Sequence, residues 1–589
     1  MKLKGVASIA ALIAAGGVLL SGCSAGSGDA SEIVKGTSIT IATNVGLTSS
    51  NGNSVNGEST VNDDVAYITS SWFNHYNHSG RLVDNVKFGT ETIVKKSPQT
   101  VRYTINSGVK WSDGTPVTAA DLLLDWASSI SKNNVPWGVN FTSVFAGSGL
   151  DLATKASVSD DGQSLTLVYS RPNADWQSAL PPTPLAAHAV FAVAVHGGTP
   201  AAANRAVVKA IADNDTSVLK KIAKAWSTGF DFDATPSNKL LDLSDGPYVI
   251  SSVNKGTSIS LLPNRSYSWG VLPKIDKFTF RVIHNPSAQV RALQNGQVNL
   301  VYGQGEANTA VALKKLNGVT TSVTSSSSYD HVDLTENSGG PFDAAAYGGD
   351  ASKALAVRQA FMKALPRQGI LDKLIKPLQP DAKLDNSLTI LPGEPGYAAS
   401  VADNGSSAYA TVDIAAAKSD LAKAGLTFIN VRFLYSKSDT RDAQEFALIR
   451  ASEARAGIRV IDDGNDDWSN VLGGKDYDAT LFAWQGSTLA ATAGRSQWQT
   501  GGASNFNGFT SARVDSDYNK LQSAQSQSVQ LKLLADVDKA GWADASTATL
   551  FQLPDINAWS SKLQNLSDSP LSPAIFWNFP NWTVSSGAK

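Results

Sequence analysis

Cysteine is nearly absent from this chain, which has a single one, Cys23, among 589 residues. One cysteine excludes an internal disulfide, and no C-x-x-C pair is available for a zinc site. Histidine is also scarce: of six, only His75 and His78 stand close together, and no carboxylate or further histidine next to them completes a metal site. We therefore expect neither a metal nor a cofactor.

The chain also lacks a large excess of positive or negative charge. The 49 basic and 51 acidic residues give a formal charge of −2, whereas nucleic-acid binding needs clustered Lys and Arg. The sequence contains no G-x-x-x-x-G-K-[ST], G-x-S-x-G or H-E-x-x-H motif. Gly303-Gln304-Gly305 lacks the third glycine of a dinucleotide fingerprint, and Asp462-Asp463 is typical of a solvated turn. These absences predict a protein that is not an enzyme and has no nucleic-acid partner.

Long apolar runs are absent except at the start, where Val6 to Leu20 is apolar and follows Lys2 and Lys4. Fifteen residues span ~22 Å as a helix, short of the ~30 Å hydrocarbon core, so the run predicts a signal peptide. Its end, Leu20-Ser21-Gly22-Cys23, resembles the lipobox of bacterial lipoproteins. The resemblance implies a signal peptide at 1–22, lipidation of Cys23, a tether at 23–36 and a membrane-anchored protein on the extracytoplasmic face. The alternative is an ordinary cleaved signal peptide with an incidental cysteine.

The first half of the mature chain predicts strands at 38–43 and 101–105. After a turn at Asp113-Gly114, Thr118 and Asp121 have the spacing of a capping box, which predicts the start of a helix that continues through Trp126.

The second half predicts a helix from Ser352 to Leu365 and another at 413–424. A strand at 429–435, a helix at 441–456 and a strand at 458–461 form a βαβ unit, which requires a parallel sheet.

One more strand is expected at 477–484. Its last residue, Trp484, runs into the polar loop Gln485-Gly486-Ser487. Because ligands bind at the carboxyl ends of strands in open α/β sheets, Trp484 is a candidate site residue. The other reading is a tryptophan without a binding role.

The stretch from Gly108 to Asp121, GVKWSDGTPVTAAD, resembles the extracellular solute-binding proteins of family 5, the oligopeptide-, dipeptide- and nickel-type binding lipoproteins of ABC importers. Further blocks of the chain fit the same family in order. They include Gly246-Pro247-Tyr248, Asn264 to Trp269, Leu293 to Asn299, Pro341-Phe342-Asp343, Val357 to Ala360, Ala415 to Gly425, Tyr477 to Trp484 and Asn507-Gly508-Phe509.

The resemblance implies an α/β, two-lobed periplasmic-binding-protein-like fold with a hinge. Lobe I would comprise 37–325, with a subdomain near 51–184, and the returning segment 548–589; lobe II, at 326–547, would hold the βαβ unit. It also implies a monomer that closes on its ligand and works with separate ABC permease and ATPase subunits.

One departure from the family concerns the residues after Trp484. In peptide-binding members, an aspartate shortly after the corresponding tryptophan holds the α-ammonium group of the peptide, and here Gln485, Gly486, Ser487 and Thr488 follow instead. Either another acid replaces it or the ligand is not a free-amine peptide. The residues expected to line the cleft are Asn44, Tyr329, Trp484, Gln485, Gly486, Ser487, Asn505 and Asn507, together with the backbone of Ala483–Ser487.

We therefore expect a lipoprotein that captures an oligopeptide or similar extended solute for an ABC importer. The alternatives are a different solute, such as a sugar, an opine or a metal chelate, and a lipoprotein that no longer transports and regulates cell-envelope assembly.

Overall fold

The computed structural model describes residues 32–130, 138–144, 149–180, 185–303, 307–486, 489–502 and 504–585. The predicted signal peptide, Cys23 and most of the predicted tether lie outside these residues. None of the described helices is long and apolar enough to cross a membrane.

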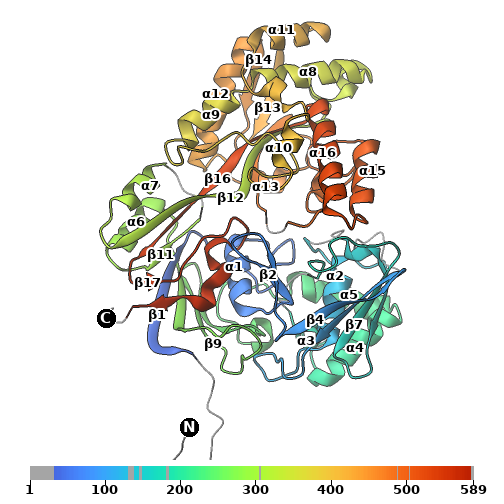
Figure 1. Ribbon diagram of the computed structural model, residues 1–589, viewed down its shortest axis with the longest axis vertical. Helices are drawn as coiled ribbons and strands as arrows, with labels where there is room; N and C mark the ends of the chain where they lie inside the picture. Colours follow the sequence, from blue (N-terminus) through green and yellow to red (C-terminus); the bar gives the residue numbers. More distant parts are fainter. Residues whose placement is uncertain are drawn as a thin grey trace, which may run out of the picture.

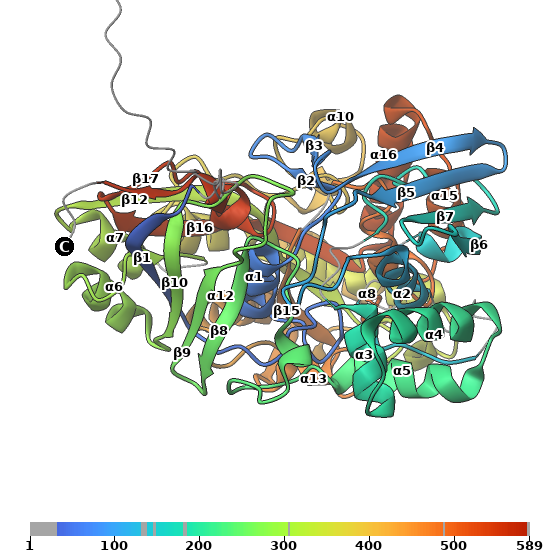
Figure 2. The same ribbon diagram turned by 90° about the horizontal axis from the view of Figure 1, so that it is seen from below.

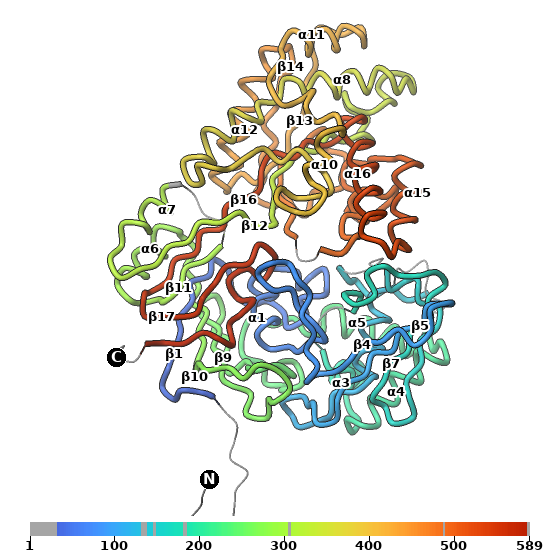
Figure 3. The backbone as a smooth tube through the Cα atoms, in the orientation of Figure 1, coloured from blue at the N-terminus to red at the C-terminus, as the bar shows by residue number. Residues whose placement is uncertain are grey.

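One large sheet organises the molecule (Figure 1). Its ten strands run in the order β14-β13-β15-β12-β16-β11-β1-β10-β9-β8, and neighbours in this order are hydrogen-bonded. Two long antiparallel strands in its middle, β12 (Val319–Leu334) and β16 (Thr547–Ser560), pair along most of their length. In Figure 3 these two strands pass from the lower body of the molecule into the upper one.

The upper lobe surrounds a hydrophobic core that extends in sequence from Val332 to Leu553. Its strands are β13 (Ile429–Leu434), β14 (Ile458–Asp462) and β15 (Ala479–Trp484). Its helices are α8 (Ala351–Ala364), α9 (Arg367–Ile370), α10 (Tyr397–Val401), α11 (Ile414–Lys423), α12 (Thr440–Glu453), α13 (Trp468–Val471), α14 (Arg495–Trp498), α15 (Ala512–Leu521) and α16 (Gln527–Asp544).

The lower lobe has a core on each side of its part of the sheet. Its strands are β1 (Val34–Thr43), β8 (Tyr248–Asn254), β9 (Ser258–Pro263), β10 (Ile275–Val282), β11 (Leu300–Val301), β17 (Leu563–Gln564) and β18 (Thr583–Val584). Its helices are α1 (Thr60–Thr69), α6 (Pro286–Gln294) and α7 (Ala307–Lys314), and β2 (Asn74–Tyr76) and β3 (Leu82–Asp84) pair as a small hairpin.

A third body, the subdomain, has its own core, which extends from Phe73 to Trp269. It combines the sheet β4-β5-β7-β6 with four helices and lies beside the lower lobe (Figure 2). Its elements are β4 (Gly89–Lys96), β5 (Gln99–Ile105), β6 (Ala153–Val158), β7 (Ser164–Tyr169), α2 (Ala119–Ser129), α3 (Ala187–Val195), α4 (Pro200–Ala212) and α5 (Thr216–Thr228). The core thus takes in helices beyond residue 184. The division into lobes at 325 and 547 remains a prediction.

Most of the predicted elements are present. Thr118 accepts a hydrogen bond from the backbone of α2 while the Asp121 side chain accepts one from the Thr118 backbone, which is the expected capping box. β13 and β14 pair in parallel around α12, as the βαβ prediction requires. The tether predicted at 23–36 was wrong for its last residues, which belong to β1. β1 begins at Val34, because the Val34 N–H donates to the Lys274 carbonyl at 2.9 Å and brings this segment against β10.

The pairing of β12 with β16 is irregular between Ser325 and Tyr329. Serine hydroxyls satisfy backbone groups there: Ser326 Oγ donates to the Leu553 carbonyl at 2.9 Å, and Ser327 Oγ donates to the Gly486 carbonyl at 2.6 Å. The irregularity lies where the strands enter the upper lobe, next to the end of β15.

The subdomain also touches the upper lobe directly. The Asp175 carboxylate accepts hydrogen bonds from the Ala491 and Thr492 N–H groups at 3.0 and 3.1 Å and from Thr492 Oγ1 at 2.6 Å. Beside it, the Arg171 guanidinium donates to Gln522 Oε1 at 2.6 Å. The two lobes therefore meet at this contact as well as through β12 and β16.

Candidate functional site

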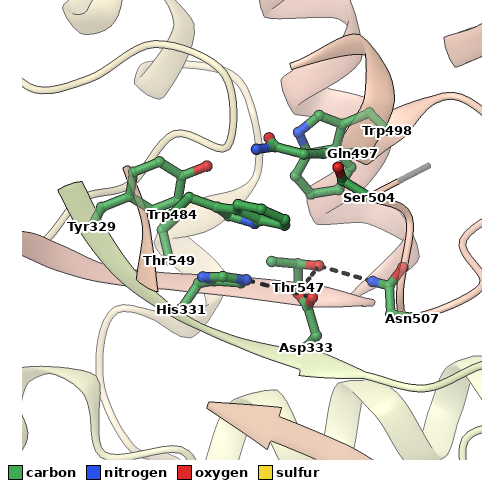
Figure 4. A pocket seen from close by; sticks show the side chains of 10 residues that line it. All are labelled: Tyr329, His331, Asp333, Trp484, Gln497, Trp498, Ser504, Asn507, Thr547 and Thr549. Atoms are coloured by element: carbon green, nitrogen blue, oxygen red, sulfur yellow. Dashed lines mark hydrogen bonds and ion pairs between the residues drawn. The ribbon is translucent and has the colours of Figure 1, made fainter. Parts of the chain in front are cut away.

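A small pocket lies in the upper lobe at the carboxyl end of β15, and it encloses a volume of about 20 Å³ (Figure 4). The lining residues are Tyr329, His331, Asp333, Trp484, Gln497, Trp498, Ser504, Asn507, Thr547 and Thr549.

Strand alternation brings three of these residues to one face of β12. Tyr329, His331 and Asp333 are two residues apart, so they project to the same side of the strand. The residues between them serve the other side, where Val332 belongs to the upper-lobe core. The paired strands complete the wall, with Thr549 opposite His331 on β16 and Trp484 opposite Tyr329 on β15.

The indole of Trp484 packs against two other rings. It stacks on the His331 ring with centroids 6.0 Å apart and planes 14° apart, and on the Phe506 ring with centroids 5.8 Å apart and planes 15° apart. These contacts hold the indole in a defined orientation where it lines the pocket. A ligand would therefore meet a fixed aromatic side chain there.

A chain of polar contacts runs along the floor of the pocket. Asn507 Nδ2 donates to Thr547 Oγ1 at 3.1 Å, and Thr547 Oγ1 donates to Asp333 Oδ1 at 2.8 Å. The other carboxylate oxygen, Asp333 Oδ2, lies 3.4 Å from His331 Nε2. Figure 4 shows this chain below the Trp484 ring.

The remaining wall mixes aromatic and hydroxyl groups. Burial raises the pKa of the Tyr329 hydroxyl, and the charges of Asp385 and Asp333 add to the shift, so this hydroxyl stays protonated and can donate a hydrogen bond. Trp498 Nε1 is buried without a partner among the described residues. No lysine or arginine is among the described residues that line the pocket. The site therefore offers hydrogen-bonding groups and one carboxylate.

The structure brings three predicted site residues, Tyr329, Trp484 and Asn507, to this one pocket. Asn505 lies next to the pocket, but its amide donates to the Gln499 and Phe509 carbonyls and holds the loop. Gln485 is exposed and does not line the pocket, and the Gly486 carbonyl accepts from Ser327.

One other predicted residue, Asn44, does not reach this pocket. Asn44 is exposed at the end of β1 in the lower lobe, where its carbonyl oxygen lies 2.6 Å from His284 Nδ1. Ser487 lies outside the described residues. That any of the predicted residues binds a ligand remains a prediction.

Several lining residues were missed from the sequence. His331 and Asp333 could have been predicted from the sequence, because they follow Tyr329 at the two-residue spacing of one strand face. Thr547 and Asp333 are 214 residues apart, so nothing local indicated their contact.

No group of three or more His, Cys, Asp or Glu side chains among the described residues is arranged to hold a metal ion. A mixed sheet whose two central strands continue from one lobe into the other, with a pocket at a strand end near their boundary, defines the class of two-lobed α/β binding proteins. The middle region of the bacterial extracellular solute-binding proteins, family 5, matches residues 89–506, so the chain belongs to this family. The predicted family and fold class are thereby confirmed.

Three similar proteins illustrate the relationship. An uncharacterized lipoprotein of Mycobacterium leprae is 25% identical over 91% of this chain and 91% of its own length. The oligopeptide-binding protein OppA of Mycobacterium tuberculosis is 22% identical over 83% of this chain and 75% of its own. The structure of the periplasmic EDTA-binding protein EppA has a TM-score of 0.77 and 22% identity, covering 94% of this chain and 97% of that one.

Proposed function

We propose that this protein is the substrate-binding lipoprotein of an ABC importer and that it captures a peptide or similarly extended solute. The pocket at Trp484 carries the proposal. An aromatic side chain surrounded by amides and hydroxyls suits a ligand held through main-chain hydrogen bonds, which gives affinity with little side-chain selectivity. The oligopeptide-binding relative supports a peptide as the solute.

The chief alternative is a metal chelate, which the structural similarity to an EDTA-binding protein suggests. A chelate of that kind carries several carboxylates, and buried carboxylates need cationic partners. Among the described residues, the lining of this pocket contains Asp333 and His331 but no lysine or arginine. The charge of the pocket therefore favours a peptide over a polycarboxylate.

The chain would work on the extracytoplasmic face of the membrane as a monomer, held by lipid on Cys23, and would deliver its ligand to a permease driven by separate ATPase subunits. The lipobox-like sequence supports the anchor, and so does a relative that is itself named a lipoprotein. Replacing Cys23 with serine should release the protein from the membrane fraction. A variant that stays membrane-bound would contradict the lipid anchor.

The binding proposal is tested by exchanging Trp484 for alanine. Purified protein is mixed with a casein digest, and the peptides retained after ultrafiltration are measured by mass spectrometry. Wild type should retain peptides, and the Trp484→Ala protein should bind the same peptides at least about tenfold more weakly, because a rigid aromatic contact is lost. Phe428→Ala is the matched control, since Phe428 is 53% exposed, comes immediately before β13 and does not line the pocket.

Failure to retain any peptide would contradict a peptide ligand. Deletion of the gene in its host separates transport from regulation, because loss of peptide uptake supports the importer. Unchanged uptake with altered envelope lipids would instead support the regulator of envelope assembly.

A further inference from the structure

His331 is a buried histidine with unused hydrogen-bonding groups. Its side chain is 1% exposed, and neither ring nitrogen makes a well-aligned hydrogen bond within the described part of the chain. Aromatic rings surround it, with the Phe482 centroid at 4.2 Å and Trp484 stacked above. Buried polar groups are normally satisfied, so an imidazole left unpartnered beside a pocket indicates a ligand or proton that completes it.

Asp333, the carboxylate next to His331, lies in the pocket without a lysine or arginine partner among the residues that the structure describes. Its side chain is 9% exposed, one oxygen accepts from Thr547, and the other faces His331 Nε2 at 3.4 Å. An ionised carboxylate at such a depth is costly unless a cation pairs with it. The pocket lining supplies no lysine or arginine among the described residues, so the cation is either a protonated His331 or part of the ligand.

The other charged groups near His331 do not supply a cation to Asp333. Asp330, the preceding residue, is buried, and its carboxylate pairs with Arg441 Nε at 3.0 Å. The charge of His331 acts on Asp330, but burial is the main reason that the pKa of Asp330 is raised. Tyr329, with ring centroids 5.9 Å apart, keeps its proton, and the facing residues Phe482, Trp484 and Thr549 do not titrate. Asp333 is therefore the carboxylate open to exchange.

We propose that His331 holds a proton that a cationic group of the ligand displaces. In the empty pocket, a protonated His331 neutralises Asp333. When an ammonium group of the ligand pairs with Asp333, the proton on His331 leaves to solvent, because two cations beside one buried carboxylate repel each other. This inference rests on the proposed binding function and adds the class of ligand group and a proton linkage to it.

The proposal makes ligand capture depend on pH. Protons and the ammonium group of the ligand compete for the place beside Asp333, so a lower pH favours the proton over the ligand. Affinity for an ammonium-bearing ligand should therefore rise by about tenfold or more from pH 5 to pH 7. A ligand without an ammonium group should bind more weakly and without this rise.

The test uses a casein digest and the same digest after complete acetylation of its amines, each presented to the full protein at about pH 5, 6 and 7. Wild type should retain unmodified peptides increasingly as pH rises and retain few acetylated ones. Asp333→Asn should lose at least about tenfold in affinity for the unmodified peptides. His331→Asn should still bind them but with an affinity that does not change with pH. His196→Asn, a substitution of an exposed histidine of the subdomain, should keep the wild-type profile.

Thermal unfolding of each variant checks that it is folded. Equal retention of the two digests, or a pH profile that persists in His331→Asn, would overturn the inference while leaving peptide binding intact. Retention of neither digest at any pH would contradict the proposed peptide function itself, and the inference with it.

Discussion

Asp555 shows how a single buried residue can make this protein sensitive to pH. It lies on β16 with 9% of its surface exposed, and no described residue donates a hydrogen bond to its carboxylate. Burial raises the pKa of Asp555 from 3.8 to about 7, and the charge of Asp568 adds to the shift. The folded state therefore holds the proton more tightly than the unfolded state does.

The sign of the effect follows from this difference. Between about pH 4 and pH 7 the folded chain binds more protons at Asp555, so this residue lowers the stability of the fold as pH rises. Asp555→Asn should raise the free energy of unfolding at about pH 8 by the order of 2 kcal/mol and should have little effect at about pH 4. Chemical denaturation at both pH values measures this. Asp381→Asn, at an exposed position, is the control, and an equal gain at both pH values would argue against the assignment.

At the scale of elements, the sequence predicted those whose signals are local. The capping box of α2 needs only Thr118 and Asp121, and the βαβ unit is visible in the apolar runs of β13 and β14. β12 was missed because its first half, VTTSVTSSSS, is rich in serine and threonine and has no apolar alternation. That segment is a strand because it pairs with β16, which lies more than 200 residues further along the chain.

The same limit applies to the pocket. Trp484 could be predicted because it ends a strand whose pattern is clear. Its stacking against Phe506 and the hydrogen bond from Thr547 to Asp333 depend on how distant segments meet in the folded protein. Sequence reasoning therefore located the end of β15 and left its surroundings unspecified.

The irregular segment of β12 gives a prediction at this scale. Ser327 Oγ donates to the Gly486 carbonyl and fixes the loop that follows Trp484, whereas the neighbouring Ser328 hydroxyl makes no hydrogen bond to a described residue. Ser327→Ala should lower the free energy of unfolding by about 1 kcal/mol, and Ser328→Ala should change it by less than about 0.5 kcal/mol. Urea denaturation measures both, and equal effects would show that the hydrogen bond to Gly486 is not what stabilises this loop.

At the scale of the whole molecule, the contact at Asp175 holds the subdomain against the upper lobe. Its carboxylate accepts three hydrogen bonds from Ala491 and Thr492, and hydrogen bonds to a charged group contribute about 1.5–3 kcal/mol each. Opening would expose these donors to water. The contact therefore favours the arrangement in which the lobes touch.

Asp175→Ala should shift the ligand-free protein toward a more open form. Small-angle X-ray scattering should record a larger radius of gyration than for the wild type, and peptide affinity should fall severalfold because closure is less favourable. Asp160→Ala removes an equal charge from an exposed turn of the same subdomain and should leave the scattering unchanged. Identical curves for Asp175→Ala and wild type would show that the contact does not set the domain arrangement.

Both ends of the described chain belong to the lower lobe, where β1 begins at Val34 and β18 ends at Val584, and Figure 1 places the terminal segments at its outer side. Only β12 and β16 lead from there into the upper lobe within the described residues. If the N-terminus is tethered to a surface, the lower lobe stays in place and the upper lobe is the one that moves. The displacement on closure then falls on the upper lobe, and its outer helices, farthest from the two strands, travel through the widest arc.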